Sequence, residues 1–261
     1  LQLLMKHKLL YILSAAMLLV SCGTEIGENE RLDYVKPQPV GKNVLVVDFT
    51  GQRCVNCPKA NEEIETLQEQ YGADTVIAVG MHSGPLGFKG NSRLLGLATD
   101  LGDTYYNYWG IEYQPTGVVD YRGKSDYTSW ASEVMQSLQQ TASVSLTATA
   151  EGTGTDLHGS VKIEGINGNT SGKLQLWLVE DSIVAMQMMP DGSANANYLH
   201  SHVFRDAVNG TWGQDVTVTE GYSTTVDYTY TLNEKWVRNH MWLIAFVYDN
   251  NGVKQVIRKH I

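Results

Sequence analysis

The sequence predicts an α/β domain followed by an all-β antiparallel sandwich of the immunoglobulin-like or jelly-roll type. Three observations support this fold class. In the first part of the chain, apolar β-branched runs alternate with segments of helical spacing, a pattern typical of α/β domains. From about residue 142 onward the helical signals stop, and short stretches with alternating apolar residues follow one another. Turn signals such as the Asn-Gly pairs at 167–168 and 251–252 separate these stretches, as expected between antiparallel strands.

Residues 1–22 are typical of a bacterial lipoprotein signal peptide. A basic stretch precedes a mostly apolar run from Leu9 to Val20, which is shorter than the about 20 apolar residues that a membrane-spanning helix needs. The run ends in Leu-Val-Ser-Cys, and these four residues resemble the lipobox of bacterial lipoproteins, so that Cys22 is expected to carry the lipid. An ordinary signal sequence with a chance cysteine is the alternative.

Residues 23–43 are polar and are predicted to form a tether between the lipid and the first folded domain. Gly23 follows the cysteine, where an aspartate is associated with retention in the inner membrane, and this favours the outer membrane. The expected location is therefore the cell envelope, as an outer membrane lipoprotein on the periplasmic face or at the cell surface, held by its N-terminal lipid anchor. The formal net charge of −9 argues against a nucleic acid as partner, because such partners require basic patches.

The expected elements are short buried strands and amphipathic helices in the α/β domain, residues 44–141, and strands alone in the β-sandwich, residues 142–261. In chain order the first domain is predicted to contain a strand at 43–50, a helix at 58–71, a strand at 75–82, a long helix or pair of helices at 91–110, a strand at 116–123 and a helix at 127–140. The second is predicted to contain strands at 144–152, 157–165, 173–181, 215–221, 223–233, 240–250 and 254–261.

Two of the three cysteines, Cys54 and Cys57, stand two residues apart at the start of the first predicted helix. Outside the cytoplasm such a pair either cycles between thiol and disulfide or stays oxidised. A zinc site would need two further ligands, often a second Cys-x-x-Cys pair or a histidine pair, and the chain has no second cysteine pair. The seven histidines are scattered apart from His200 and His202. No metal and no other cofactor is therefore expected.

The order of elements in the first domain resembles the thioredoxin fold. A strand is followed by a Cys-x-x-Cys pair that opens a helix, and a proline precedes a later strand. The sequence reads Val-Asp-Phe at 47–49, four further residues and then Cys54, in the same register as that family. The resemblance implies that Asp48 is the buried carboxylate that helps to move the proton of the resolving Cys57, and that Pro115 is a cis-proline facing the cysteines. A helix start also stabilises a thiolate at Cys54, the expected nucleophile for thiol–disulfide exchange. The alternative for Asp48 is an aspartate at the end of a strand that bonds the backbone, and the alternative for Pro115 is an ordinary turn proline.

The same resemblance implies a substrate-binding edge around the cysteines. Gln114 and Thr116, on either side of the proline, would offer groups to an extended peptide, and Arg53 would contribute to the same surface. Two features depart from the family pattern. Arg53 stands where redox-active members usually carry tryptophan, and an insertion occupies residues 82–96. His82, at the start of this insertion, could approach the cysteines, although a satisfied loop histidine is the simpler interpretation.

The stretch YLHSHVFRDAVNGTWG at 198–213, together with the lipobox and the Cys-x-x-Cys domain, resembles the Bacteroidetes outer-membrane lipoprotein family known as the 28-kilodalton outer-membrane protein family. Membership would imply a thioredoxin-like domain followed by a β-sandwich on a lipid anchor. The resemblance indicates architecture more than activity, so two functions stay open.

The first function is that of a membrane-anchored thiol–disulfide oxidoreductase that acts through Cys54 and Cys57 on exported proteins with thiols or disulfides. The alternative is a binding or adhesion lipoprotein at the outer membrane or cell surface, in which a thioredoxin scaffold keeps the two cysteines as a structural disulfide. Asp48 and Pro115 favour the oxidoreductase, whereas Arg53, the insertion and the second domain favour the binding protein. The reduction potential separates the two, because structural disulfides lie below about −300 mV.

Overall fold

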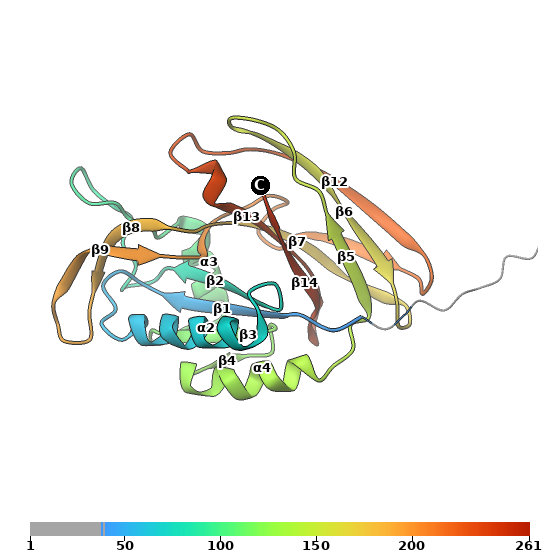
Figure 1. The fold of residues 1–261 in the computed structure, drawn as a ribbon, viewed down its shortest axis with the longest axis horizontal. Helices are drawn as coiled ribbons and strands as arrows, with labels where there is room; N and C mark the ends of the chain where they lie inside the picture. Colours follow the sequence, from blue (N-terminus) through green and yellow to red (C-terminus); the bar gives the residue numbers. More distant parts are fainter. Residues whose placement is uncertain (1–37, 39) are drawn as a thin grey trace, which may run out of the picture. The chain divides into compact units, whose positions relative to one another are not determined.

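The computed structural model describes residues 38 and 40–261, so the signal peptide, Cys22 and most of the tether lie outside the described residues. Within this range the chain is mostly β-sheet, with fourteen strands, three α-helices and two 3-10 helices (Figure 1). No helix of the described range is long and apolar enough to span a membrane.

The N-terminal part contains β1 (Val44–Thr50), α2 (Cys57–Tyr71), β2 (Val76–His82), α3 (Asp100–Tyr108), β3 (Thr116–Val119), β4 (Lys124–Ser125), η3 (Tyr127–Ser129) and α4 (Trp130–Leu138). The C-terminal part contains β5 (Val144–Ala148), β6 (Asp156–Gly165), β7 (Thr170–Glu180), β8 (Ile183–Met188), β9 (Ala194–His200), β10 (Val203–Ala207), β11 (Gln214–Val218), β12 (Ser223–Thr231), η4 (Arg238–His240), β13 (Met241–Asp249) and β14 (Gly252–His260). The sequence does not predict β8, β9 and β10.

Two predicted elements of the N-terminal part are shorter than expected. The helix expected at 91–110 begins only at Asp100, because the side chain of Thr99 caps it by accepting a hydrogen bond from the Gly102 amide at 2.9 Å. The strand expected at 116–123 becomes β3 and stops after four residues. The next two residues have φ angles of 51° and 59°, a left-handed conformation that interrupts an extended strand.

One mixed sheet runs through both parts of the chain in the order β14-β13-β7-β10-β2-β1-β3-β4, and β11 also pairs with β7. β1 lies between β2, which is parallel to it, and β3, which is antiparallel. The two parts join where Val203 of β10 pairs in parallel with Gly80 of β2. A smaller antiparallel sheet contains β12, β6 and β5, and β8 pairs with β9 in a hairpin. One layer of the expected sandwich is therefore shared with the α/β elements, because β10 hydrogen-bonds to β2.

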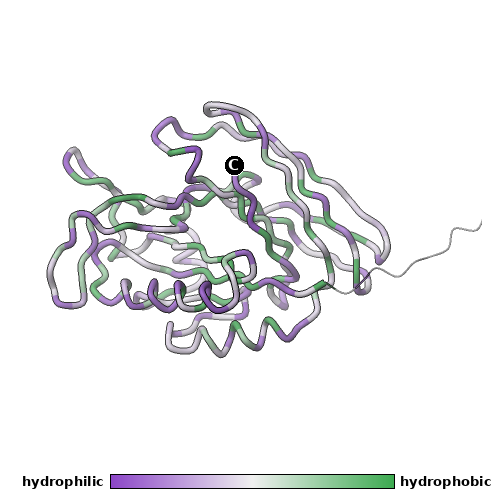
Figure 2. Tube along the Cα trace, viewed as in Figure 1, coloured by the Kyte–Doolittle hydropathy of each residue, from purple (hydrophilic) through white to green (hydrophobic). Residues whose placement is uncertain are grey.

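Hydrophobic clusters hold these layers together. On one face of the main sheet, alternate residues of β1, β2, β7 and β13 pack with Tyr105 of α3 around the buried Trp177. On the other face, α2 and α4 cover β1 and β2, and the small sheet covers β7 and β13. Successive strand residues point to opposite faces, so β1 is buried along its whole length. Figure 2 shows the matching pattern of hydrophobic strands and hydrophilic turns.

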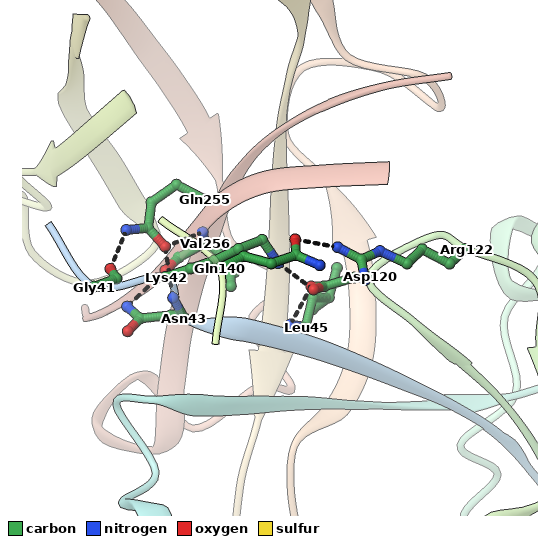
Figure 3. Close-up of polar contacts among 9 residues, drawn as sticks. All are labelled: Gly41, Lys42, Asn43, Leu45, Asp120, Arg122, Gln140, Gln255 and Val256. Atoms are coloured by element: carbon green, nitrogen blue, oxygen red, sulfur yellow. Dashed lines mark hydrogen bonds and ion pairs between the residues drawn. The ribbon is translucent and has the colours of Figure 1, made fainter. Parts of the chain in front are cut away.

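A buried polar cluster joins the start of β1 to β14 and to the residue after β3 (Figure 3). Lys42 forms an ion pair with Asp120, and both side chains are buried. Asp120 also accepts a hydrogen bond from the amide of Leu45 at 3.0 Å. The side-chain oxygen of Gln255 in β14 accepts a hydrogen bond from the amide of Asn43 at 2.9 Å. These contacts fasten the first strand to the last, across a sequence separation of 212 residues.

Candidate functional site

The predicted cysteine pair is a disulfide at the point where the chain passes from β1 into α2. Cys54 and Cys57 are bonded, and their Cα atoms lie 5.4 Å apart. Cys57 begins α2 and Pro58 follows in its first turn, where a missing amide hydrogen breaks no helical hydrogen bond. Asn56 occupies the N-cap position but makes no side-chain capping bond. The disulfide therefore constrains the turn that leads into α2.

The insertion at residues 82–96 packs directly on the cysteine loop. The amide of Arg53 donates a hydrogen bond to the Leu86 carbonyl oxygen at 3.0 Å. A Cβ at Gly51 would lie 2.3 Å from the same oxygen, so only glycine fits at this position. The guanidinium of Arg53 lies over the ring of Phe88, 4.9 Å from its centroid. The arginine predicted to contact substrate thus contacts the insertion.

The β8–β9 hairpin also covers the disulfide. Gln187 of β8 donates a hydrogen bond from its side-chain amide to the Cys54 carbonyl oxygen at 2.9 Å. The amide of Met188 donates to the Gln52 carbonyl oxygen at 2.9 Å, and the Gln52 side chain is itself fully buried. Because of this cover, the exposed fractions of the two cysteines are only 2% and 3%.

A polar cavity of about 30 Å³ lies beside Cys57, and Asp48, His82 and His200 contribute to its lining. Burial raises the pKa of Asp48 to about 8 and lowers the pKa of His200 to about 4. Burial also lowers the pKa of His82 well below its ordinary value. The three side chains are therefore mainly neutral near pH 7. Each has one buried polar atom without a hydrogen-bond partner in the described chain, and a cavity of this size suits a bridging water.

The two neighbouring histidines of the sequence do not share a strand. His200 ends β9, whereas His202 lies in the turn before β10 with a φ of 44°. The ring of His200 packs edge-on against His82, with centroids 5.2 Å apart. Within the described residues, no three His, Cys, Asp or Glu side chains come together in a way that could hold a metal ion.

The residues predicted to bind substrate around Pro115 make internal contacts. The peptide bond between Gln114 and Pro115 is cis. The side-chain amide of Gln114 donates to the carbonyl oxygens of Thr50 at 2.6 Å and Ser83 at 3.0 Å, and thereby bridges the ends of β1 and β2. Thr116 is only 2% exposed. Contact of these residues with a peptide substrate stays a prediction.

Two buried glutamines, Gln52 and Gln187, connect the cysteine loop to its cover, and neither is among the site residues that the sequence predicts. The burial of β8, Ile183–Met188, alternates along the strand, but its sequence does not, because the more exposed Val184 and Met186 are apolar and the buried Gln187 is polar. The position of that strand over the cysteines could not be read from the sequence either, because Gln187 and Cys54 are 133 residues apart in the chain.

Comparisons with known proteins concern the fold and the C-terminal part of the chain. HBP35 of Porphyromonas gingivalis is similar in structure, with a TM-score of 0.65 and 16% identity over 85% of this chain and 76% of that chain, which is a likeness of fold. A domain of the outer membrane lipoprotein Omp28 from the same organism shows 27% identity and a TM-score of 0.35, over 46% of this chain and 88% of that chain. A comparison with curated proteins gives no match.

Residues 102–261 match the family described as outer membrane protein Omp28, and this range is more than half of the chain. The match begins after both Cys54 and Cys57, so it does not depend on the cysteine pair. It confirms the family suggested by the stretch at 198–213 and places the protein in the outer membrane. The chain belongs to the Omp28 family of outer membrane proteins.

Proposed function

We propose that the chain is a binding lipoprotein of the outer membrane in which the bond between Cys54 and Cys57 is a permanent structural disulfide. The burial of both cysteines under the β8–β9 hairpin and the insertion carries this proposal. Thiol–disulfide exchange requires a thiolate to reach a sulfur atom, and reactive cysteines are accordingly partly exposed. Exposed fractions of 2% and 3%, with Gln187 bonded to the Cys54 carbonyl, leave an incoming peptide no path to the sulfur atoms.

The proposal keeps a thioredoxin-like origin for residues 44–141. The order of the elements supports it, with β1 between a parallel β2 and an antiparallel β3 and with the cysteines at the start of α2. A proline directly before β3 fits the same arrangement. In this proposal the scaffold is retained for its shape, and residues 142–261 extend its sheet and supply further surface for binding. The lipid is expected on Cys22, which lies outside the described residues.

The disulfide organises the site locally. Its sequence separation of 3 closes a short loop, for which loop-closure entropy gives about 2 kcal/mol. Gln187 of the hairpin donates to the Cys54 carbonyl oxygen at the start of this loop. Gln52 lies just before the loop, and its side-chain amide donates to the carbonyl oxygens of Leu95 at 3.1 Å and Met186 at 3.0 Å. Loss of the disulfide is therefore expected to loosen the hairpin and the insertion together.

The test is reduction of the folded full-length protein by dithiothreitol, followed by alkylation and mass spectrometry. A structural disulfide should resist reduction without urea and should be reduced quickly once urea unfolds the chain. Gln187→Ala removes the hydrogen bond to the Cys54 carbonyl and should speed reduction of the folded protein. Gln214→Ala, at an exposed glutamine of β11, is the matched control and should leave the rate unchanged. Equal reduction rates with and without urea in the wild type would contradict the proposal.

A thiol–disulfide oxidoreductase is the second candidate, because of Asp48. Its carboxyl group is buried, mainly protonated at neutral pH and adjacent to the same cavity as Cys57, which suits a group that exchanges a proton with a resolving cysteine. In this case the hairpin would have to move aside. Cys57→Ser would then trap reducible, higher-mass adducts on non-reducing gels of the native host, whereas Cys54→Ser would trap none. The absence of adducts in both variants, with a protected disulfide in the wild type, favours the binding protein.

A further inference from the structure

An open hollow of about 640 Å³ lies far along the chain from the cysteines, where the end of α3 meets β7, β11 and the end of β13. One side of the hollow is the antiparallel pair of β11 and β7, with Thr217 opposite Ser171 and Asp215 opposite Lys173. Aromatic side chains from α3, from the loop before β11 and from β13 also line it. Its volume is in the usual range for small-molecule sites.

The aromatic side chains of the hollow are held in place by packing contacts and a hydrogen bond. Tyr108 at the end of α3 is 63% exposed, and its ring centroid lies 4.4 Å from that of Trp212. Trp212 packs edge-on against the buried Tyr105 at 5.3 Å, and its carbonyl oxygen accepts a hydrogen bond from the Tyr248 hydroxyl at 2.8 Å. The exposed ring of Tyr108 therefore rests on an ordered aromatic base, so a ligand that stacks on it need not order this base.

The polar part of the hollow is electrically balanced. Lys173 pairs with Asp215 at 2.8 Å, and Asp249 pairs with Lys254 at 2.8 Å. All charged side chains that line the hollow are in these two ion pairs. A charged ligand gains little from such a rim, whereas ligand hydroxyl groups can donate to the carboxylates and accept from the ammonium group of Lys173. The side chain of Asn250 adds an amide that can do both.

We propose that this hollow is a subsite for a neutral oligosaccharide, with one sugar ring stacked on Tyr108. A pyranose has flat faces of C–H groups and an edge of hydroxyl groups. The negative face of an aromatic ring attracts the weakly positive C–H groups, and the balanced rim satisfies the hydroxyl edge. The inference rests on the proposed function, because it names the ligand class of a binding protein.

Two other classes of small ligand fit less well. A phosphate or nucleotide needs a cation that is not already paired, and Lys173 is paired with Asp215. A quaternary ammonium ion is attracted to aromatic faces, but it would gain little further attraction from the rim, because Asp215 and Asp249 are already paired with lysines. Among sugars, phosphates and quaternary ammonium ions, only sugars match both an apolar ring face and a polar rim without net charge.

The test uses the full-length protein in a zwitterionic detergent that has no sugar headgroup. Maltohexaose, cellohexaose, xylohexaose and chitohexaose are titrated by calorimetry and by tryptophan fluorescence, with choline as the cationic probe. At least one oligosaccharide should bind the wild type, and Tyr108→Ala should weaken its Kd about fivefold or more. Tyr108→Phe keeps the ring and should stay within about twofold. Tyr222→Ala removes a comparably exposed tyrosine, 70% exposed and not among the residues that line the hollow, and should leave the Kd unchanged.

Four outcomes overturn the subsite: no binding by any of the four oligosaccharides, an unchanged Kd in Tyr108→Ala, an equal loss in Tyr222→Ala, or tighter binding of choline than of every sugar. The disulfide experiment judges the proposed function separately. A protein with a protected disulfide that binds none of these sugars refutes the subsite alone.

Discussion

Replacement of Asp48 by asparagine is expected to stabilise the fold, and increasingly so as the pH rises. Asp48 is 4% exposed in the middle of β1, and burial raises its pKa from 3.8 to about 8. Between these two pH values the native state holds a proton on Asp48 that the unfolded state has released. Stability therefore falls with rising pH through this window, and asparagine, which has the same shape and no charge, does not share that loss.

The magnitude follows from the pKa. The rise from 3.8 to about 8 is about four pKa units, and each unit corresponds to about 1.4 kcal/mol. The free energy of unfolding of Asp48→Asn should thus be close to that of the wild type near pH 4 and exceed it by up to about 6 kcal/mol at pH 8 and above. His82 and His200 act in the opposite direction, because their lowered pKa values make stability rise with pH. They are present in both proteins and cancel in the difference.

The assay is urea unfolding of the full-length protein at a series of pH values, monitored by circular dichroism and tryptophan fluorescence. Asp227→Asn, at an exposed position of β12, is the control, and its difference from the wild type should not change with pH. Parallel stability curves for Asp48→Asn and the wild type from about pH 5 to pH 8 would refute the reasoning. They would mean that the Asp48 carboxylate is ionised at little cost in the native state.

Three further predictions concern the anchor and the packing. Cys22→Ala should release the protein from membranes and abolish fatty-acid incorporation; a variant as membrane-bound as the wild type would contradict the lipid anchor. Lys42→Met should cost about 3–5 kcal/mol in urea unfolding, because it leaves Asp120 charged, buried and unpaired, and Lys42→Met combined with Asp120→Asn should recover much of that loss. Gly117→Ala should cost about 1–3 kcal/mol, since the new Cβ would lie 2.3 Å from the indole of Trp130; an unchanged urea midpoint would show that Trp130 has room to move.

The local pattern of residues around the cysteines was sufficient to predict the elements there. An unbroken apolar run indicates a strand covered on both faces, and β1 is buried at all seven positions. The spacing of Ala60, Ile64 and Leu67 predicts the buried side of α2, and all three are buried. The pairing of Cys54 with Cys57 also follows from their close spacing. All of these features depend on neighbours within one strand or one helical turn, whereas the position of Asp48 beside Cys57 was implied only by the resemblance to the thioredoxin fold.

The hairpin over the disulfide was decided only by the tertiary structure. The run Ile183–Met188 is apolar except for Gln187, which is buried, so its sequence indicates neither the exposed side of the strand nor the surface that the strand covers. The same holds for β10, whose pairing with β2 joins the two parts of the chain into one sheet through Val203 and Gly80.

The sequence by itself therefore determined a cysteine pair at the start of a helix, and the tertiary structure decided that both cysteines are buried. Any exposed strand edge can accept hydrogen bonds from any other strand, so register and neighbour are set by the packing of the whole core. Cys54, whose chemistry depends on its exposure, is accordingly covered by a hairpin whose Gln187 bonds its carbonyl oxygen from 133 residues away in the chain.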